Sequence, residues 1–186
     1  MSTITPLMPG QPVPDLSLSL VGGGTWRLSE RKPENFSMVV VYRGLHCPIC
    51  KTYLRDLQDK LDAFNERGVE VLTFSTDDVD RATQSVADWE IDRLPVGYGV
   101  SFEDCRRWGL FLTKGRGKTS AGVSELDIFV EPGLFLIRPD GTLFFQSIQT
   151  MPFARPKFDE ILKAIDYILK NDYPPRGAVV DHTKEG

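Results

Sequence analysis

Residues 36–50 of this 186-residue chain read FSMVVVYRGLHCPIC, and this stretch specifies the centre of the fold. Its first part, Phe36 to Tyr42, is an almost continuous apolar run rich in β-branched residues, which predicts a strand buried on both faces. Gly44 to Cys50 breaks that run. Beyond it, apolar residues recur at helical spacing until Gly68, namely at Tyr53, Leu54, Leu57, Leu61 and Phe64. The stretch therefore predicts a central strand, a short loop carrying two cysteines, and an amphipathic helix.

Further elements are predicted on both sides of this unit. Upstream, Leu16 to Leu20 alternates apolar and polar residues, and the glycines at 22–24 allow residues 25–28 to return as a hairpin partner. Downstream, the pattern predicts, in order, a strand over 69–74, a helix over 79–90, an extended piece over 94–100, a short helix over 102–108, a mobile loop over 113–122, a hairpin over 134–148, and a helix over 158–169.

These elements predict one α/β domain over residues 1–186, with an irregular tail over 175–186. The strand–helix–strand unit implies a parallel strand pair, whereas the last hairpin is antiparallel. We therefore expect a mixed central sheet that is flanked by helices and extended by an N-terminal β-hairpin.

Composition excludes several classes of partner. The chain has 22 Lys and Arg against 26 Asp and Glu, so its net charge is −4, which gives no electrostatic basis for binding nucleic acid or an anionic membrane. No apolar run comes near the roughly 20 residues that a membrane helix needs. Residues 1–14 have neither a basic cluster nor an apolar stretch, so we predict no signal peptide and a cytoplasmic location.

The candidate chemical centre is Cys47-Pro48-Ile49-Cys50. Cys47 falls near the N-cap of the predicted helix, and Pro48 suits the first turn, where its missing N–H costs nothing. Free backbone N–H groups and the helix dipole stabilise a thiolate at such a position. Two cysteines three residues apart lie close enough to form a disulfide. We therefore expect an exposed Cys47 sulfur to attack and the deeper Cys50 to resolve.

Two other interpretations of the motif are half of a zinc site and a pair of packing cysteines. A structural zinc ion needs four ligands, and the chain has three Cys and two His with no second Cys pair. Three cysteines also disfavour a secreted disulfide scaffold. We therefore predict redox chemistry with no metal and no bound cofactor.

Three segments resemble the alkyl hydroperoxide reductase/thiol-specific antioxidant (AhpC/TSA) family, in its peroxiredoxin-like redoxin branch. Residues 39–50 are similar to a YRG-x-x-C-P-x-C segment, residues 75–77 with 87–89 to an S-x-D…W segment, and residues 134–141 to an F-x-I-x-P-x-G segment. The resemblance covers about residues 8–170. It implies a thioredoxin-like fold, an antioxidant oxidoreductase, and a possible homodimer.

The sequence departs from the family at two sites. Typical members carry P-x-x-x-T-x-x-C, whose cysteine attacks peroxide; here Cys50 takes that position, Cys47 replaces the Thr, and Arg43 replaces the Pro. The family's arginine before the later core strand falls on Pro132. A proline there is cis in thioredoxin folds and packs against the cysteines, leaving the neighbouring backbone free for substrate, so we predict a cis Pro132 rather than an ordinary pre-strand proline.

Four further residues have two interpretations each. Arg43 either lies near the thiolates or is a strand-end arginine. His46 either lowers the thiol pKa or moves a proton, or it shapes a substrate surface. Cys105 is either a second resolving cysteine or, as we favour, a buried packing residue. Arg155, beyond the last strand, lines either the site or a partner surface.

Three functions follow as hypotheses. We favour thiol–disulfide exchange, because the Thr and Arg that bind peroxide are absent. A peroxidase in which Cys50 or Cys47 is oxidised by peroxide is the second hypothesis, and a non-catalytic redox sensor is the third. The first two predict protein disulfides or small peroxides as oxidants and a reducing thiol system as the electron donor.

Overall fold

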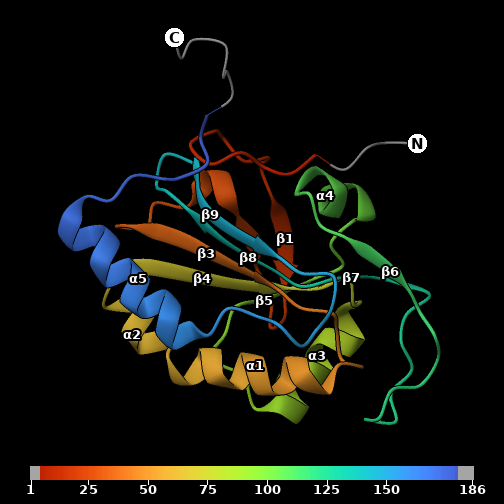
Figure 1. Cartoon of the computed structure of the whole chain (residues 1–186). Coiled ribbons are helices and arrows are strands. Elements are labelled where there is room, and N and C mark those ends of the chain that lie inside the picture. The colour runs from red at the N-terminus through yellow and green to blue at the C-terminus, as the bar shows by residue number, and fades with distance from the viewer. Residues whose placement is uncertain (1–4, 180–186) are drawn as a thin grey trace.

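The computed structural model describes residues 5–179 and contains a seven-stranded mixed sheet (Figure 1). The strand order is β2-β1-β5-β4-β3-β8-β9, in which β3, β4 and β5 run parallel and the other neighbours run antiparallel. The strands are β1 (Ser17–Leu20), β2 (Thr25–Arg27), β3 (Phe36–Val41), β4 (Val69–Phe74), β5 (Val96–Tyr98), β8 (Gly133–Ile137) and β9 (Leu143–Ile148). The predicted mixed sheet and N-terminal hairpin are confirmed.

Strand β3 is buried along its whole length, as its sequence predicts. Met38 and Val40 face one core cluster, which includes residues of α1 (Pro48–Asp59), α2 (Leu61–Asn65) and α5 (Phe158–Asn171). Val39 and Val41 face a second cluster on the other side of the sheet. The strand therefore has a separate apolar core on each face, which explains why its apolar run does not alternate with polar residues.

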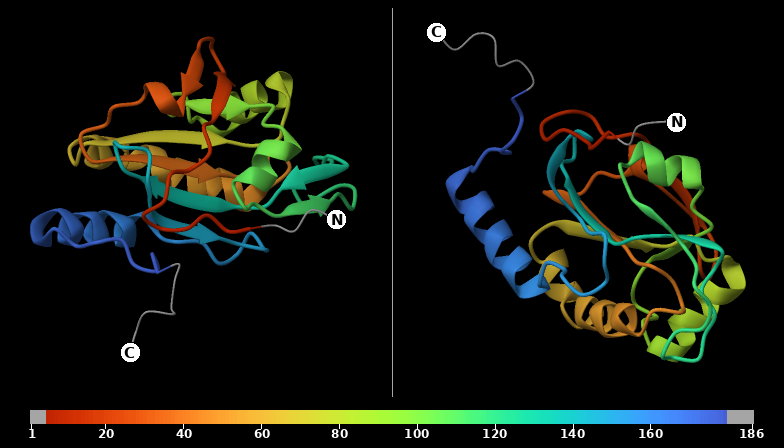
Figure 2. Two further views of the ribbon diagram at one scale, coloured as in Figure 1. Left: turned by 90° about the horizontal axis from the view of Figure 1, so that it is seen from above. Right: turned by 45° about the vertical axis from the view of Figure 1, so that its right-hand side comes forward.

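Helices cover both faces of the sheet, as Figures 1 and 2 show. Helices α1, α2, α3 (Val79–Trp89) and α5 contribute residues to the first cluster, whereas α4 (Phe102–Arg107) contributes Cys105 to the second. A short 3-10 helix, Leu28–Glu30, follows β2. Within residues 5–179, no helix has both the length and the apolar character that crossing a membrane requires.

The helix predicted to continue to Gly68 is instead two helices. Helix α1 ends at Asp59, and Lys60 (φ −103°, ψ 4°) separates it from α2. The apolar stripe nevertheless continues, because Leu61 and Phe64 pack into the same cluster as Leu57. The helical spacing was predicted correctly, and the break was not.

The structure contains two strands that were not predicted from the sequence: one overlaps the start of the predicted mobile loop over 113–122, and the other lies beyond its end. Strands β6 (Leu112–Lys114) and β7 (Ile128–Val130) pair antiparallel as a separate small sheet. The chain between them runs past α3 (Figure 2), and Arg81 of α3 donates a hydrogen bond to the Ser124 carbonyl (3.1 Å). The tail has no helix or strand over residues 174–179, and the rest of the predicted irregular tail lies outside the described residues.

Candidate active site at the two cysteines

The loop between β3 and α1 is built on a buried carboxylate from the loop after β4. Asp77 is fully buried; it accepts the Leu45 N–H (2.7 Å) and pairs with the Arg81 guanidinium (2.8 Å). Gly44 has φ +130°, and a Cβ there would lie 2.8 Å from both Asp77 oxygens. The close packing of Gly44 against Asp77 therefore requires glycine and fixes the chain entering the cysteine motif.

The two cysteines lie at the first turn of α1, as predicted. Cys47 is the N-cap residue, and Pro48 is the first helical residue. The Cys50 N–H donates to Cys47 Sγ (3.3 Å), and the Arg43 N–H donates to Cys50 Sγ (3.4 Å). Both cysteines are free thiols. The motif is thus a reduced dithiol whose sulfurs each accept a backbone hydrogen bond.

Both sulfurs are buried, so the expectation of an exposed Cys47 was wrong. Cys47 is 1% exposed and Cys50 is 0% exposed. The N-cap position would leave Cys47 open on an isolated helix, but here tertiary neighbours cover it. One of these is Arg155, whose Nη2 lies 3.9 Å from Cys47 Sγ and 3.1 Å from Cys50 Sγ.

The environment separates the acidities of the two thiols. A hydrogen bond from the Cys50 thiol, helped by the Cys50 N–H and by the positive charges of Arg155 and Arg43, lowers the pKa of Cys47 to about 6 against the opposing effect of burial. Burial raises the pKa of Cys50 well above its ordinary value. The pair therefore holds a thiolate at Cys47 and a thiol at Cys50 near neutral pH.

This assignment predicts the pH profile of Cys47 alkylation. Since only the thiolate reacts, lowering the pH through 6 protonates Cys47 and slows the reaction with iodoacetamide, about tenfold per pH unit, while the rate levels off above about pH 7. The measurement is site-resolved mass spectrometry of alkylated protein from pH 4 to 9. Cys105, whose pKa burial raises to about 12, is the internal control that stays unmodified. A midpoint for Cys47 near 9, the value of an ordinary thiol, would contradict the assignment.

The sequence left Arg155 between two roles, and the structure places it at the site. It lies between β9 and α5, and its guanidinium stacks over the Tyr53 ring with 5.0 Å between the guanidinium carbon and the ring centroid. Its Nε donates to the Pro152 carbonyl (3.0 Å), and the Tyr53 hydroxyl donates to the Pro156 carbonyl (2.7 Å). No motif or spacing links Arg155 to the cysteines, because its contact with Cys50 spans 105 residues of sequence.

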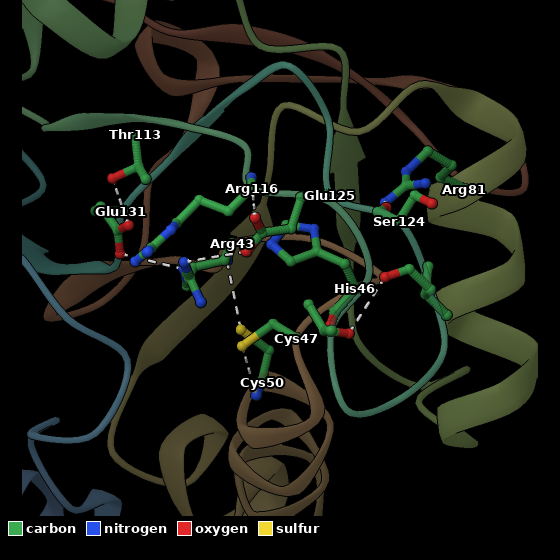
Figure 3. Close-up of polar contacts among 12 residues, drawn as sticks. Arg43, His46, Cys47, Cys50, Arg81, Thr113, Arg116, Ser124, Glu125 and Glu131 are labelled. Atoms are coloured by element: carbon green, nitrogen blue, oxygen red, sulfur yellow. Dashed lines mark hydrogen bonds and ion pairs between the residues drawn. The ribbon is translucent and has the colours of Figure 1, made fainter.

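The Arg43 side chain contacts two carboxylates, those of the buried Glu131 and the partly buried Glu125 (Figure 3). Its guanidinium lies 3.3 Å from a Glu131 carboxylate oxygen and 3.7 Å from a Glu125 oxygen, and it covers the Phe129 ring. Thr113 donates to the other Glu131 oxygen (2.6 Å). Arg43 thus lies near the sulfurs, which is one of the two interpretations that the sequence left open, but its direct hydrogen bond to sulfur comes from its backbone N–H.

His46 is fully buried against Phe129, with 4.6 Å between the ring centroids. Within residues 5–179, neither ring nitrogen has a hydrogen-bond partner. Burial, followed by the charge of Arg43, lowers the pKa of His46 to about 4. The imidazole is therefore neutral at pH 7 and supplies no positive charge to the thiolate. Its carbonyl accepts the Thr119 hydroxyl (2.7 Å), which connects the motif to the β6–β7 loop.

The prediction of a cis Pro132 was wrong. No peptide bond in the described part of the chain is cis. The Glu131 N–H donates to the Phe111 carbonyl (2.8 Å), and the Pro132 carbonyl accepts the Gln149 N–H (2.9 Å). The Glu131 N–H and the Pro132 carbonyl, which flank the Glu131–Pro132 peptide bond, are thus both hydrogen-bonded within the protein. They are not free to pair with a substrate.

Cys105 lies in α4 and packs in the second core cluster, whereas Cys47 and Cys50 belong to the first, on the opposite face of the sheet. We therefore expect the Cys105→Ala variant to consume one equivalent of hydrogen peroxide at the wild-type rate. Its only effect should be a stability loss of about 1 kcal/mol from the removed sulfur. Stopped-flow peroxide consumption checks this, and a rate loss of tenfold or more would show that Cys105 takes part.

Within residues 5–179, no group of three or more Cys, His, Asp or Glu is arranged to hold a metal ion.

Comparisons with known proteins show the family and the fold. The AhpC/TSA family model matches residues 9–146. A 1-Cys peroxiredoxin B from Oryza sativa subsp. indica is 32% identical over 95 residues, which are 50% of this chain and 41% of that relative. Among solved structures, peroxidoxin BcpB from Mycobacterium tuberculosis has a TM-score of 0.67 at 20% identity, covering 87% of this chain and 98% of the other.

AhpC from the same organism has a TM-score of 0.70 at 18% identity, covering 90% and 96% of the two chains. At these identities the structural likeness shows the fold alone, and it confirms the predicted thioredoxin-like fold. The match to the rice relative spans less than half of that relative's length.

Proposed function

Since this chain belongs to the AhpC/TSA family, we propose that it is a thiol-dependent peroxidase in which Cys47 attacks a small hydroperoxide and Cys50 resolves the product. The match to the family and the peroxiredoxin relatives support thiol-dependent antioxidant chemistry. The roles proposed for the two cysteines rest on the local geometry.

The observation that carries the proposal is the burial of both sulfurs beside a cation. A protein disulfide must align its two sulfurs with the attacking thiolate and bring its flanking chain with them, and a Cys47 that is 1% exposed does not allow this without a large opening. A hydroperoxide is a smaller reactant, because only its two-oxygen group has to reach the Cys47 sulfur. The closed site therefore favours the small oxidant over the disulfide that the sequence favoured.

The reaction balances with the groups at the site. The Cys47 thiolate attacks the terminal oxygen of the hydroperoxide; an S–O bond forms, the O–O bond breaks, and the leaving alkoxide or hydroxide takes a proton to become alcohol or water. The Cys50 thiol then attacks the Cys47 sulfenic acid, which releases water and closes the Cys47–Cys50 disulfide. A small reducing dithiol then returns both cysteines to thiols and is itself oxidised to a disulfide.

Thiol–disulfide exchange is the second candidate, because the lowered pKa of an N-cap cysteine in a CxxC motif also suits attack on a disulfide. Stopped-flow oxidation of the reduced wild type by hydrogen peroxide, cumene hydroperoxide and the disulfides of insulin separates the two. We expect both peroxides to oxidise Cys47 at least about 100 times faster than insulin does. Faster oxidation by insulin would make thiol–disulfide exchange the favoured function. Slow oxidation by all three oxidants would favour the non-catalytic redox sensor.

A further inference from the structure

We infer that Arg155 is a catalytic residue for both sulfurs: it stabilises Cys47 as the attacking thiolate and Cys50 as the thiolate that leaves when the disulfide is reduced. Its Nη2 is 3.1 Å from Cys50 Sγ and 3.9 Å from Cys47 Sγ, so one guanidinium serves both atoms. The inference rests on the proposed dithiol pair but not on the identity of the oxidant.

Reduction of the Cys47–Cys50 disulfide is the step in which negative charge forms on Cys50 and must be stabilised. An external thiolate attacks Cys47 Sγ, a new S–S bond forms, the Cys47–Cys50 bond breaks, and its electron pair leaves on Cys50. If the reductant is a dithiol, its second thiolate then attacks the mixed disulfide and releases Cys47. The reductant ends as a disulfide, and two electrons have passed to the protein. The leaving sulfur, Cys50, is fully buried, so water cannot stabilise its charge.

The protein must therefore supply the charge stabilisation at Cys50. Its sulfur accepts one backbone N–H, from Arg43 at 3.4 Å, and one charged donor, from Arg155 at 3.1 Å. The charged donor is the closer and the stronger of the two, because a hydrogen bond with an ionised partner is about twice as strong as one between neutral groups.

The two arginines near the motif differ in what balances their charge. The Arg43 guanidinium is held between Glu131 at 3.3 Å and Glu125 at 3.7 Å, so its charge is largely neutralised (Figure 3). Arg155 forms no ion pair with any carboxylate of residues 5–179. Its nearest acidic partners are the Cys47 thiolate and the Cys50 thiol, and its charge is therefore available to both sulfurs.

Arg155 is also fixed in place before the reaction begins. Its Nε is bound to the Pro152 carbonyl and its plane lies over Tyr53, which also binds the Pro156 carbonyl. Its buried Nη1 has no hydrogen-bond partner within residues 5–179 and remains a donor for the oxygen of an incoming oxidant. A donor that is already oriented loses little entropy when charge develops beside it.

The test compares disulfide reduction in four oxidised proteins: wild type, Arg155→Gln, Arg155→Lys and the control Arg176→Gln. Arg176 also lies over a tyrosine ring, with 5.9 Å between its guanidinium carbon and the Tyr173 ring centroid, but it contacts neither sulfur. Each protein is oxidised with diamide and reduced with dithiothreitol under stopped flow. We expect Arg155→Gln to be reduced about 100 times more slowly, the size of effect that losing one preoriented donor has.

Arg155→Lys keeps the charge without the planar fork, so its rate should fall between those of wild type and Arg155→Gln, and Arg176→Gln should match wild type. A second readout is the midpoint of Cys47 alkylation against pH, which should move upward in Arg155→Gln and stay unchanged in the control. Circular dichroism establishes that each variant is folded. If Arg155→Gln does not fold, the comparison of Arg155→Lys with wild type still tests the inference.

Wild-type reduction rates in both Arg155 variants would overturn the inference, as would an equal loss in Arg176→Gln. Because dithiothreitol reduction involves no peroxide, the outcome is separate from the proposed function. A wild type that reacts slowly with peroxides but shows the Arg155 effect on reduction would refute the peroxidase and leave the role of Arg155 standing.

Discussion

Replacing Cys47 by serine is expected to abolish the reaction with hydrogen peroxide, with a loss of at least about 1000-fold in the single-turnover rate. A serine hydroxyl is not ionised at neutral pH, and the Cys50 thiol left behind is fully buried with a raised pKa, so it cannot replace the missing thiolate. The measurement is peroxide consumption by the reduced variant at pH 7 under stopped flow.

The matched control is Cys50→Ser, which keeps the attacking sulfur and removes only the resolving one. This variant should still consume one equivalent of peroxide, but its product should be a sulfenic acid at Cys47 rather than a disulfide. Fast peroxide consumption by Cys47→Ser together with slow consumption by Cys50→Ser would assign the attack to Cys50 instead.

The largest expected effect on stability comes from Asp77→Ala. Removing this buried carboxylate leaves the Leu45 N–H and the Arg81 guanidinium without their partner, so the free energy of unfolding should fall by about 3–5 kcal/mol. Urea unfolding followed by tryptophan fluorescence measures this loss. The alkylation rate of Cys47 should change as well, because Asp77 holds the loop that enters the motif.

Asp78→Ala is the matched control for Asp77→Ala. Its carboxylate caps α3 by accepting the Arg81 N–H (2.9 Å) at an exposed position, so its removal should cost only about 1 kcal/mol. Equal losses in the two variants would mean that the Asp77 carboxylate does not hold the β3–α1 loop.

The parts of the fold that the sequence predicted well are those set by local pattern. The buried run of β3 and the helical spacing of α1 follow from side-chain periodicity, and Cys47 at the N-cap with Pro48 in the first turn follows from helix-end chemistry. Strands β6 and β7 were missed because they are three residues long and pair only with each other across the intervening loop. A strand of three residues is too short to show the alternation of apolar and polar residues by which strands are recognised in a sequence.

The site was predicted only in part, for a related reason. Burial of Cys47 and the position of Arg155 depend on contacts between distant segments, which no spacing records. The cis Pro132 was inferred from thioredoxin folds, but here the backbone on both sides of that bond is engaged by Phe111 and Gln149.

The loss of the family's arginine at position 132 weakened the peroxidase hypothesis when only the sequence was considered. The structure places a different arginine, Arg155, on both sulfurs from the segment between β9 and α5. A cation is therefore present at the site although the position that usually supplies it holds Pro132. This is why the geometry favours a peroxide as oxidant where the sequence favoured a disulfide.

The family pattern and the local geometry assign the attack on peroxide to different cysteines. The pattern puts Cys50 at the attacking position, whereas burial and hydrogen bonding put the thiolate on Cys47. Identifying which cysteine becomes the sulfenic acid decides between them. Cys47→Ser and Cys50→Ser are each treated with one equivalent of hydrogen peroxide in the presence of dimedone, and the labelled residue is located by peptide mass spectrometry. We expect rapid labelling of Cys47 in Cys50→Ser and almost none of Cys50 in Cys47→Ser; rapid labelling of Cys50 with none of Cys47 would refute the proposed roles.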